Sequence, residues 1–127
     1  MTNIISQPAL QDEKQRELAL DISQSFIIQA PAGSGKTTLL IKRLLKLIDA
    51  VNKPEEILAI TFTKKAANEM RERLLQALRD SAIESRNVGS VCQEKNSKYL
   101  AILQNPNRLN ILTIDAFNAR LNKQLPI

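Results

Sequence analysis

Hydrophobic positions along the chain follow two different spacings. Short apolar runs bounded by polar residues, or by Pro and Gly, predict buried strands at Phe26–Gln29, Ile57–Ile60 and Ile111–Ile114. Between these runs apolar residues recur three or four positions apart, which is the spacing of one face of a helix. This second spacing predicts helices at Asp12–Ile22, Lys36–Val51, Ala67–Leu78, Lys98–Leu103 and Ala116–Leu125.

The order of these elements predicts the fold class. Strands that alternate with helices indicate an α/β protein with a parallel sheet, because each helix returns the chain to the same edge of the sheet. The polar stretch Asp80–Ser97 contains Gly89 and shows neither spacing, so we expect a loop or a disordered insertion there. A chain of 127 residues is long enough to form one domain with its own core, and residues 1–127 are predicted to do so.

Composition excludes several kinds of chemistry. The chain has no histidine, which removes histidine-based acid–base catalysis, serine–histidine triads and the commonest metal ligand. Its single cysteine, Cys92, cannot form an intrachain disulfide and indicates a reducing compartment, so we expect a cytoplasmic protein. Basic residues interrupt the apolar stretch Leu39–Val51, and no segment is predicted to cross a membrane. The net charge of +5 suits a nucleic-acid partner without requiring one.

The strongest motif is a glycine-rich segment between the first predicted strand and the second predicted helix. It reads Ala30-Pro31-Ala32-Gly33-Ser34-Gly35-Lys36-Thr37 and nearly matches the phosphate loop G-x-x-x-x-G-K-[ST], with Ala30 at the first glycine position. In such a loop the backbone N–H groups and the start of the following helix point at phosphates. The motif therefore predicts a nucleoside triphosphate site, provided that the loop joins a central strand to the helix that it starts.

Each residue of the predicted site has an expected role. Lys36 supplies positive charge to the β- and γ-phosphates, and the Thr37 hydroxyl ligates Mg²⁺, so these two are the predicted catalytic residues. Contacts to the nucleotide are predicted at Ala30, Pro31, Ala32, Gly33, Ser34, Gly35, Lys36, Thr37 and Thr38. The alternative is a glycine-rich turn followed by a surface lysine, which the position between a strand and a helix disfavours.

Four blocks together resemble the superfamily 1 helicases of the UvrD/Rep type, most closely the RecB/AddA branch, in which a helicase is coupled to a nuclease. The first block, Leu10–Glu17, is similar to the family's glutamine motif, and the match falls on Gln15. A glutamine amide offers a donor and an acceptor side by side, as adenine requires, so the resemblance implies ATP rather than GTP. By its chemistry alone, Gln15 is more simply a solvated helix residue. The second block is the phosphate loop.

The third block, Ile60–Met70, is similar to the family's motif Ia, which contacts single-stranded DNA. A strand that ends in Thr-Phe-Thr and opens a helix places polar groups and a ring at the carboxyl edge of the sheet, where ligands collect. The resemblance implies DNA contacts at Thr61, Phe62, Thr63 and Lys64, with the Phe62 ring on a base and the Thr63 hydroxyl at a phosphate. The alternative for Phe62 is a core ring. Lys64 stands where many members of the family have asparagine.

The fourth block, Asn107–Phe117, is similar to motif Ib in its TIDAF form, and it adds Thr113 and Phe117 to the implied DNA contacts. Asp115 also follows an apolar run, as the Mg²⁺-binding carboxylate of a Walker B strand does. However, Ala116 follows it where a Walker B motif has glutamate, and the resemblance assigns the position otherwise. Asp115 is therefore kept outside the predicted catalytic residues.

The resemblance implies a P-loop NTPase (RecA-like) three-layer fold with a parallel sheet, incomplete at the C-terminus. It implies the N-terminal part of an ATP-dependent DNA helicase that moves 3′–5′ along single-stranded DNA, uses ATP and Mg²⁺, and has a helicase–nuclease partner subunit. The acidic pair and the arginine finger of a complete motor cannot be placed in this sequence, so we expect negligible ATP turnover from this chain alone. The rival interpretations are a P-loop protein outside the helicases, such as a small kinase or an ATP-gated switch, and a degenerate ATP-binding module.

Overall fold

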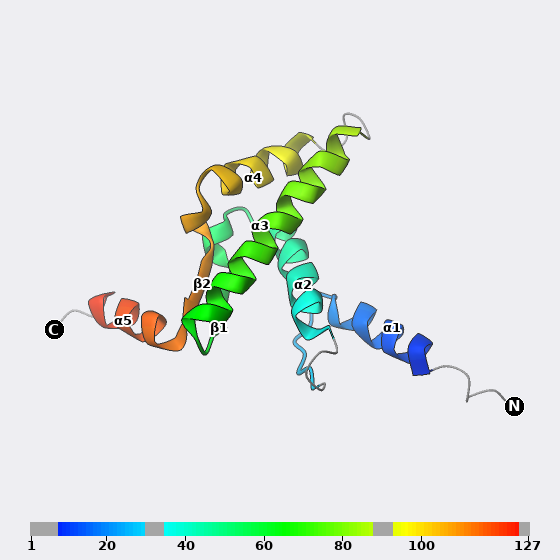
Figure 1. Cartoon of the computed structure of the whole chain (residues 1–127), viewed down its shortest axis with the longest axis horizontal. Coiled ribbons are helices and arrows are strands. Elements are labelled where there is room, and N and C mark those ends of the chain that lie inside the picture. The colour runs from blue at the N-terminus through cyan, green and yellow to red at the C-terminus, as the bar shows by residue number, and fades with distance from the viewer. Residues whose placement is uncertain (1–7, 30–34, 88–92, 125–127) are drawn as a thin grey trace, which may run out of the picture. The chain divides into compact units, whose positions relative to one another are not determined.

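The computed structural model describes residues 8–29, 35–87 and 93–124. Helices dominate the described residues and are accompanied by one pair of parallel strands (Figure 1). The chain divides into two compact units, Met1–Leu47 and Ile48–Ile127, where the sequence predicts a single domain. Within the described part, no helix is both long enough and apolar enough to pass through a bilayer.

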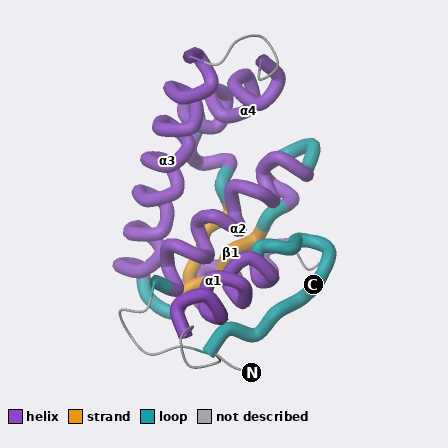
Figure 2. The backbone as a smooth tube through the Cα atoms, turned by 90° about the vertical axis from the view of Figure 1, so that its right-hand side faces the viewer, coloured by secondary structure: helices purple, strands orange, loops and turns teal. Residues whose placement is uncertain are grey.

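The first unit consists of α1 (Pro8–Ala19), a loop, and most of α2 (Lys36–Ala50). The loop leaves α1 through a tight turn and then runs extended to residue 29 (Figure 2). In that turn the Asp21 carboxylate accepts hydrogen bonds from the Ser23 hydroxyl (2.6 Å) and backbone N–H (2.9 Å). These bonds stabilise the ionised form and lower the pKa of Asp21, with a smaller contribution from the charge of Arg43.

The strand predicted at Phe26–Gln29 is wrong for the described structure. Residues 25–29 are extended but pair with no neighbour, because the described sheet contains β1 and β2 alone. Extended backbone becomes a strand only when another strand satisfies its N–H and C=O groups. Ile27 is 92% exposed, as expected for a segment that no sheet covers. Of the strand–loop–helix arrangement that the phosphate loop requires, the structure shows the helix, which begins at Lys36 as predicted.

The second unit is built around two parallel strands, β1 (Leu58–Thr61) and β2 (Asn110–Thr113), with Ala59 opposite Ile111. A short 3₁₀ turn precedes each strand, η2 (Pro54–Glu56) and η4 (Pro106–Arg108). The two strands lie within one residue of the predicted Ile57–Ile60 and Ile111–Ile114. Three helices complete the unit, α3 (Lys64–Asn87), α4 (Gln93–Gln104) and α5 (Ile114–Gln124).

One face of this small sheet is covered and the other is largely open. Ile111 and Thr113 of β2 are buried, and α3 lies against the strands, where Arg71 Nη2 donates to the Ile111 carbonyl (2.9 Å). Leu58 and Ile60 of β1 alternate with the covered positions and are 45% and 44% exposed. The described fold is therefore helix-rich with a small parallel sheet. It shows the parallel strands and helices of the predicted α/β fold, but not its three layers.

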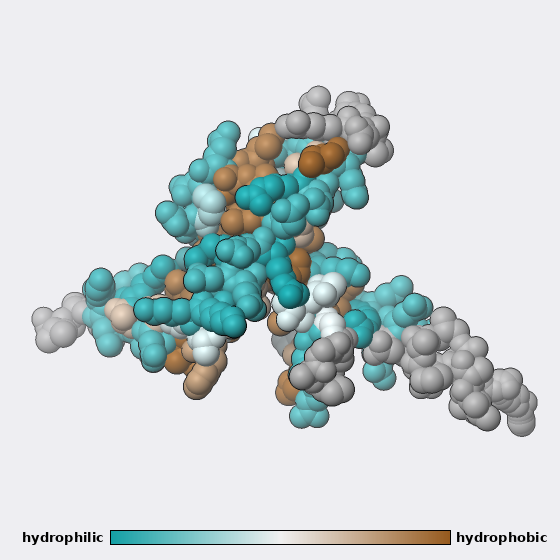
Figure 3. Space-filling view, viewed as in Figure 1, coloured by the Kyte–Doolittle hydropathy of each residue, from teal (hydrophilic) through white to brown (hydrophobic). Residues whose placement is uncertain are grey.

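A helical hairpin of α3 and α4 forms much of the core of the second unit. Leu74, Leu78 and Ala82 recur every fourth residue on α3 and are buried, as are Tyr99 and Ile102 of α4. Figure 3 shows hydrophilic side chains over the outer surface of α3 and apolar residues where α3 meets α4. Each fully buried leucine contributes about 1.5–3 kcal/mol to stability.

The loop or disordered insertion predicted at Asp80–Ser97 is wrong for most of its length. Residues 80–87 continue α3 and residues 93–97 begin α4, while residues 88–92 lie outside the described residues. Several polar residues of this stretch are exposed on the helices, among them Asp80, Glu84 and Glu94. The Asp80 carboxylate accepts a hydrogen bond from the Gln76 side chain, one turn earlier on α3 (2.9 Å). The packing of the hairpin stabilises helices that the polar composition obscures.

Candidate functional site

A cavity of about 310 Å³ lies in the first unit beside the start of α2. Its walls include Gln15 and Arg16 of α1, Phe26 of the extended segment, and Gly35 and Lys36. Cavities of roughly 300–1,000 Å³ are typical of small-molecule sites. The structure thus brings the predicted adenine contact, Gln15, to the same cavity as the predicted phosphate contacts Gly35 and Lys36.

Gly35 has a backbone conformation that favours glycine. Its φ is +89°, and a Cβ built on it would lie 2.9 Å from Nη1 of Arg16. Its carbonyl accepts the hydrogen bond from Leu39 N (3.1 Å) that opens α2. A residue with a side chain at this position would be strained and would displace the guanidinium that lies beside the helix start.

The other predicted nucleotide contacts are exposed where the structure describes them. Gln15 lies on α1 with its side chain in solvent, and Lys36, Thr37 and Thr38 form the exposed first turn of α2. The predicted contacts Ala30, Pro31, Ala32, Gly33 and Ser34 lie outside the described residues.

The predicted protein ligand of magnesium is Thr37. No group of three or more His, Cys, Asp or Glu side chains is placed to hold a metal ion in the described ranges. Thr37 offers a hydroxyl on the first turn of α2, and Mg²⁺ at triphosphates is commonly held by phosphate oxygens, water and few side chains. The residues present fit a metal ion that arrives with a triphosphate.

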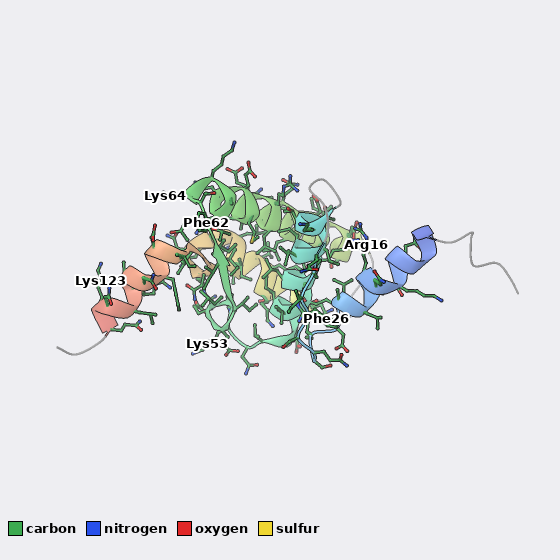
Figure 4. The ribbon with its side chains drawn as sticks, turned by 90° about the horizontal axis from the view of Figure 1, so that it is seen from below. Arg16, Phe26, Lys53, Phe62, Lys64 and Lys123 are labelled. Carbon is green, nitrogen blue, oxygen red and sulfur yellow. The ribbon has the colours of Figure 1, made fainter. Side chains whose placement is uncertain are left out.

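The junction between β1 and α3 exposes the residues predicted to contact DNA. Thr61 Oγ1 donates to the Thr63 carbonyl (3.1 Å), and Thr63 Oγ1 accepts the N–H of Ala66 (3.1 Å), which caps α3. Phe62 lies between these threonines and is 87% exposed, so the alternative of a core ring is wrong (Figure 4). Lys64 is exposed on the first turn of α3.

The junction between β2 and α5 has the same kind of cap, but its ring is less exposed than Phe62. Thr113 is 9% exposed, and its Oγ1 accepts the N–H of Ala116 (3.1 Å). Phe117 on the next turn is half-buried. Asp115 is exposed in the first turn of α5, and Ile114, the first residue of that helix, separates it from β2. It therefore does not directly follow the strand as a Walker B carboxylate would.

Arg16 and Phe26 are residues of the cavity to which the sequence assigned no role. Arg16 directly follows Gln15 in the glutamine motif, and this adjacency was the available signal. Phe26 was assigned to a buried strand, although its ring is 38% exposed. The chain has three Phe and one Tyr, and this scarcity was the available signal that each ring has a specific place.

Comparisons with known proteins identify the family of the chain. Residues 11–125 match the family described as "UvrD/REP helicase N-terminal domain". The chain is 37% identical over 106 residues to an ATP-dependent helicase/nuclease subunit of Lactobacillus johnsonii, covering 83% of this chain and 8% of that protein. Proteins of the same name from Desulfitobacterium hafniense and Clostridium botulinum are 35% and 38% identical over 115 and 97 residues, covering 86% and 73% of this chain and 8% and 7% of theirs.

These relatives are much longer than this chain. The chain spans about 8% of the length of the curated relatives it matches. No solved structure gives a significant match.

Proposed function

Because the chain belongs to the family of UvrD/REP helicase N-terminal domains, we propose that it is the ATP-binding part of an ATP-dependent motor that moves along single-stranded DNA. The proposed polarity is 3′–5′, and the proposed context is a helicase–nuclease with a second, partner protein, in DNA recombination or repair. The fold proposed for the assembled domain is the RecA-like three-layer arrangement, in which further strands would extend the β1–β2 sheet.

The observation that carries the proposal is the cavity beside Gly35 and Lys36. It combines a motif for binding phosphates, a helix start preceded by glycine, and two cationic side chains, Lys36 and Arg16. Helix N-termini and cations both favour bound anions. In this proposal Lys36 binds the β- and γ-phosphates and Thr37 ligates the Mg²⁺ carried by the nucleotide.

The remaining nucleotide contacts are proposed from the motifs. Gln15 recognises adenine, and Thr38 contacts a phosphate from the first turn of α2. The backbone of Ala30, Pro31, Ala32, Gly33, Ser34 and Gly35 surrounds the phosphates.

The proposed DNA contacts lie at the ends of the two strands. Phe62 stacks on a base, because an almost fully exposed ring offers a face to a nucleobase. Thr61, Thr63 and Lys64 act on the backbone at the same junction. Thr113 and Phe117 contribute from the equivalent junction of β2 and α5.

Nucleotide binding is tested with a fluorescent ATP analogue and the purified 127-residue chain. Lys36→Ala is expected to weaken binding more than tenfold, because the lost ammonium group would neutralise phosphate charge. Lys42→Ala is the matched control, since Lys42 is exposed on the same helix outside the phosphate loop and should bind like the wild type. Equal affinity of wild type and Lys36→Ala would overturn the proposal.

DNA binding and turnover are tested separately. Affinity for a single-stranded oligonucleotide should fall steeply with salt, because bound cations release counterions from the phosphates. A flat salt response would count against the DNA interface. ATP hydrolysis by this chain alone should be negligible, and sustained hydrolysis stimulated by single-stranded DNA would contradict that expectation.

A further inference from the structure

Arg43 binds the backbone of the loop that follows α1. It lies about two helical turns after Lys36 on α2. Its Nη1 donates to the carbonyls of Ala19 (2.6 Å) and Asp21 (3.0 Å), and its Nη2 donates to the carbonyl of Gln24 (2.8 Å). One side chain therefore joins three backbone positions between the end of α1 and the extended segment.

The same guanidinium also holds an aromatic ring. Its central carbon lies 5.4 Å from the centroid of the Phe26 ring, which is within the range of a cation–π contact. Arginine can do both because its planar group presents donors at its edge and a face to the ring. A lysine ammonium at this position would lack the planar face and the fixed fork of donors.

The groups that Arg43 holds belong to the cavity. Ala19 and Phe26 line it directly, and Ala19 is the last residue of the helix that carries Gln15 and Arg16. A cation at the carbonyl end of a helix is also favoured by the helix dipole. Arg43 thereby ties α1 and the Phe26 wall to α2, the helix whose first residues are the predicted phosphate contacts.

We propose that Arg43 is a positioning residue for recognition of the nucleotide base. It sets the distance of α1 and Phe26 from the start of α2, so that the Gln15 amide meets the adenine edge when the phosphates are bound at Lys36. Phosphate binding itself depends on the start of α2 and does not need Arg43. The proposal rests on the proposed function, because it requires an adenine nucleotide in the cavity.

The test separates base recognition from phosphate binding. ATP, GTP and inorganic tripolyphosphate compete with a fluorescent ATP analogue for the 127-residue chain and its variants. In Arg43→Lys, which keeps the charge and most of the volume, the preference for ATP over GTP should fall by roughly tenfold, the worth of one donor–acceptor pair on a base. The affinity for tripolyphosphate should change less than about twofold, because no base is involved.

Two further variants sharpen the result. Phe26→Leu removes the ring but keeps an apolar side chain, and it should lower the ATP preference by a smaller factor. Lys46→Gln is the matched control, since it removes an exposed cation one turn from Arg43 on the same helix and should keep the full preference. Thermal unfolding by circular dichroism accompanies each variant.

Each outcome decides between the two proposals. If Arg43→Lys weakens all three ligands by the same factor, Arg43 supports the fold alone and the inference is overturned. Full retention of the ATP preference in Arg43→Lys overturns it as well. If wild type and Lys36→Ala bind ATP equally, the proposed function fails and the inference fails with it, a pattern distinct from the other two.

Discussion

Three helices of this chain begin at candidate binding turns, and α2 begins differently from α3 and α5. The residue before α2 is Gly35, which has a positive φ and no side chain. The residues before α3 and α5 are Thr63 and Thr113, whose hydroxyl oxygens accept backbone N–H groups three residues further on. The first N–H groups of a helix lack partners within the helix. The threonines satisfy one at each helix start, whereas Gly35 has no side-chain group with which to do so.

This difference separates binding from stability. In the proposed function the start of α2 offers backbone donors to an anion, while the threonine caps of α3 and α5 use such donors to stabilise the protein. In the DNA interface that we propose at the β1–α3 junction, the helix N-terminus therefore contributes less than the motif suggests. The exposed Phe62 ring and Lys64 contribute more, and the Thr63 hydroxyl can still donate its hydrogen to a phosphate.

The largest expected effect is at Gly35. Gly35→Ala should cost about 1–3 kcal/mol of backbone strain at the positive φ of this position, in addition to its contact with Arg16. We expect the affinity for ATP to fall by at least tenfold in titrations with the fluorescent analogue. Unchanged affinity would remove the contrast between α2 and the two threonine-capped helices.

The two aromatic rings should respond in opposite ways. Phe62→Ala should weaken single-stranded DNA binding by about 1–3 kcal/mol, the contribution of one stacked base. It should leave the melting temperature unchanged, because the Phe62 ring is 87% exposed. Phe117→Ala removes a half-buried ring and should lower the melting temperature. Fluorescence anisotropy and thermal unfolding measure the two effects. A loss of stability in Phe62→Ala would show that the ring is packed after all.

The two threonine caps should contribute differently to stability. Thr63→Ala and Thr113→Ala each remove a helix cap worth about 0.5–2 kcal/mol, and the loss should be larger at Thr113, which is 9% exposed. Urea unfolding measures both, with Thr63→Ser and Thr113→Ser as controls that keep the hydroxyl. Neither alanine variant should change ATP affinity. A drop in ATP affinity for either would contradict the separation of roles.

The smallest expected effect on stability is at the 3₁₀ turns that precede the two strands. Arg108 of η4 donates to the Glu55 carboxylate of η2 (Nε–Oε1 2.6 Å), and this hydrogen bond lowers the pKa of Glu55. A carboxyl with a lowered folded-state pKa adds stability above its ordinary pKa and loses it as pH falls through the lowered value. Because the pair is on the surface, Glu55→Gln should only slightly reduce the acid dependence of the melting temperature below about pH 4. If the melting temperature of Glu55→Gln depended on pH as steeply as that of the wild type, or more steeply, the Glu55–Arg108 pair would not contribute to acid stability.

Sequence patterns predicted the helix starting at Lys36, both paired strands and the family, which the match over residues 11–125 confirms. The sequence patterns failed where contacts with another segment of the chain decide the structure. The segment Phe26–Gln29 has a strand-like sequence but no paired neighbour in the described residues. Conversely, Ala82 lies in a polar stretch, yet it extends the buried stripe of Leu74 and Leu78. The four-residue spacing of these three residues can be seen in the sequence.

The nucleotide site stays a prediction from its motifs. Gln15, Gly35 and Lys36, which belong to two separate motifs, line one cavity in the structure. In the sequence, Arg43 is recognisable only as a charge that interrupts an apolar stretch. Its role depends on three carbonyl oxygens, and a sequence pattern does not show where backbone acceptors lie.

The parallel pairing of β1 with β2 has a consequence for the order of folding. Leu58 pairs with Asn110, so all of α3 and α4 lies between the two strands along the chain. Closing so long a loop is entropically costly and slow, whereas helices and their hairpins form from neighbouring residues. We expect the α3–α4 hairpin to form early and to bring the strand ends together, so that both threonine-capped junctions are completed only in the last, rate-limiting step.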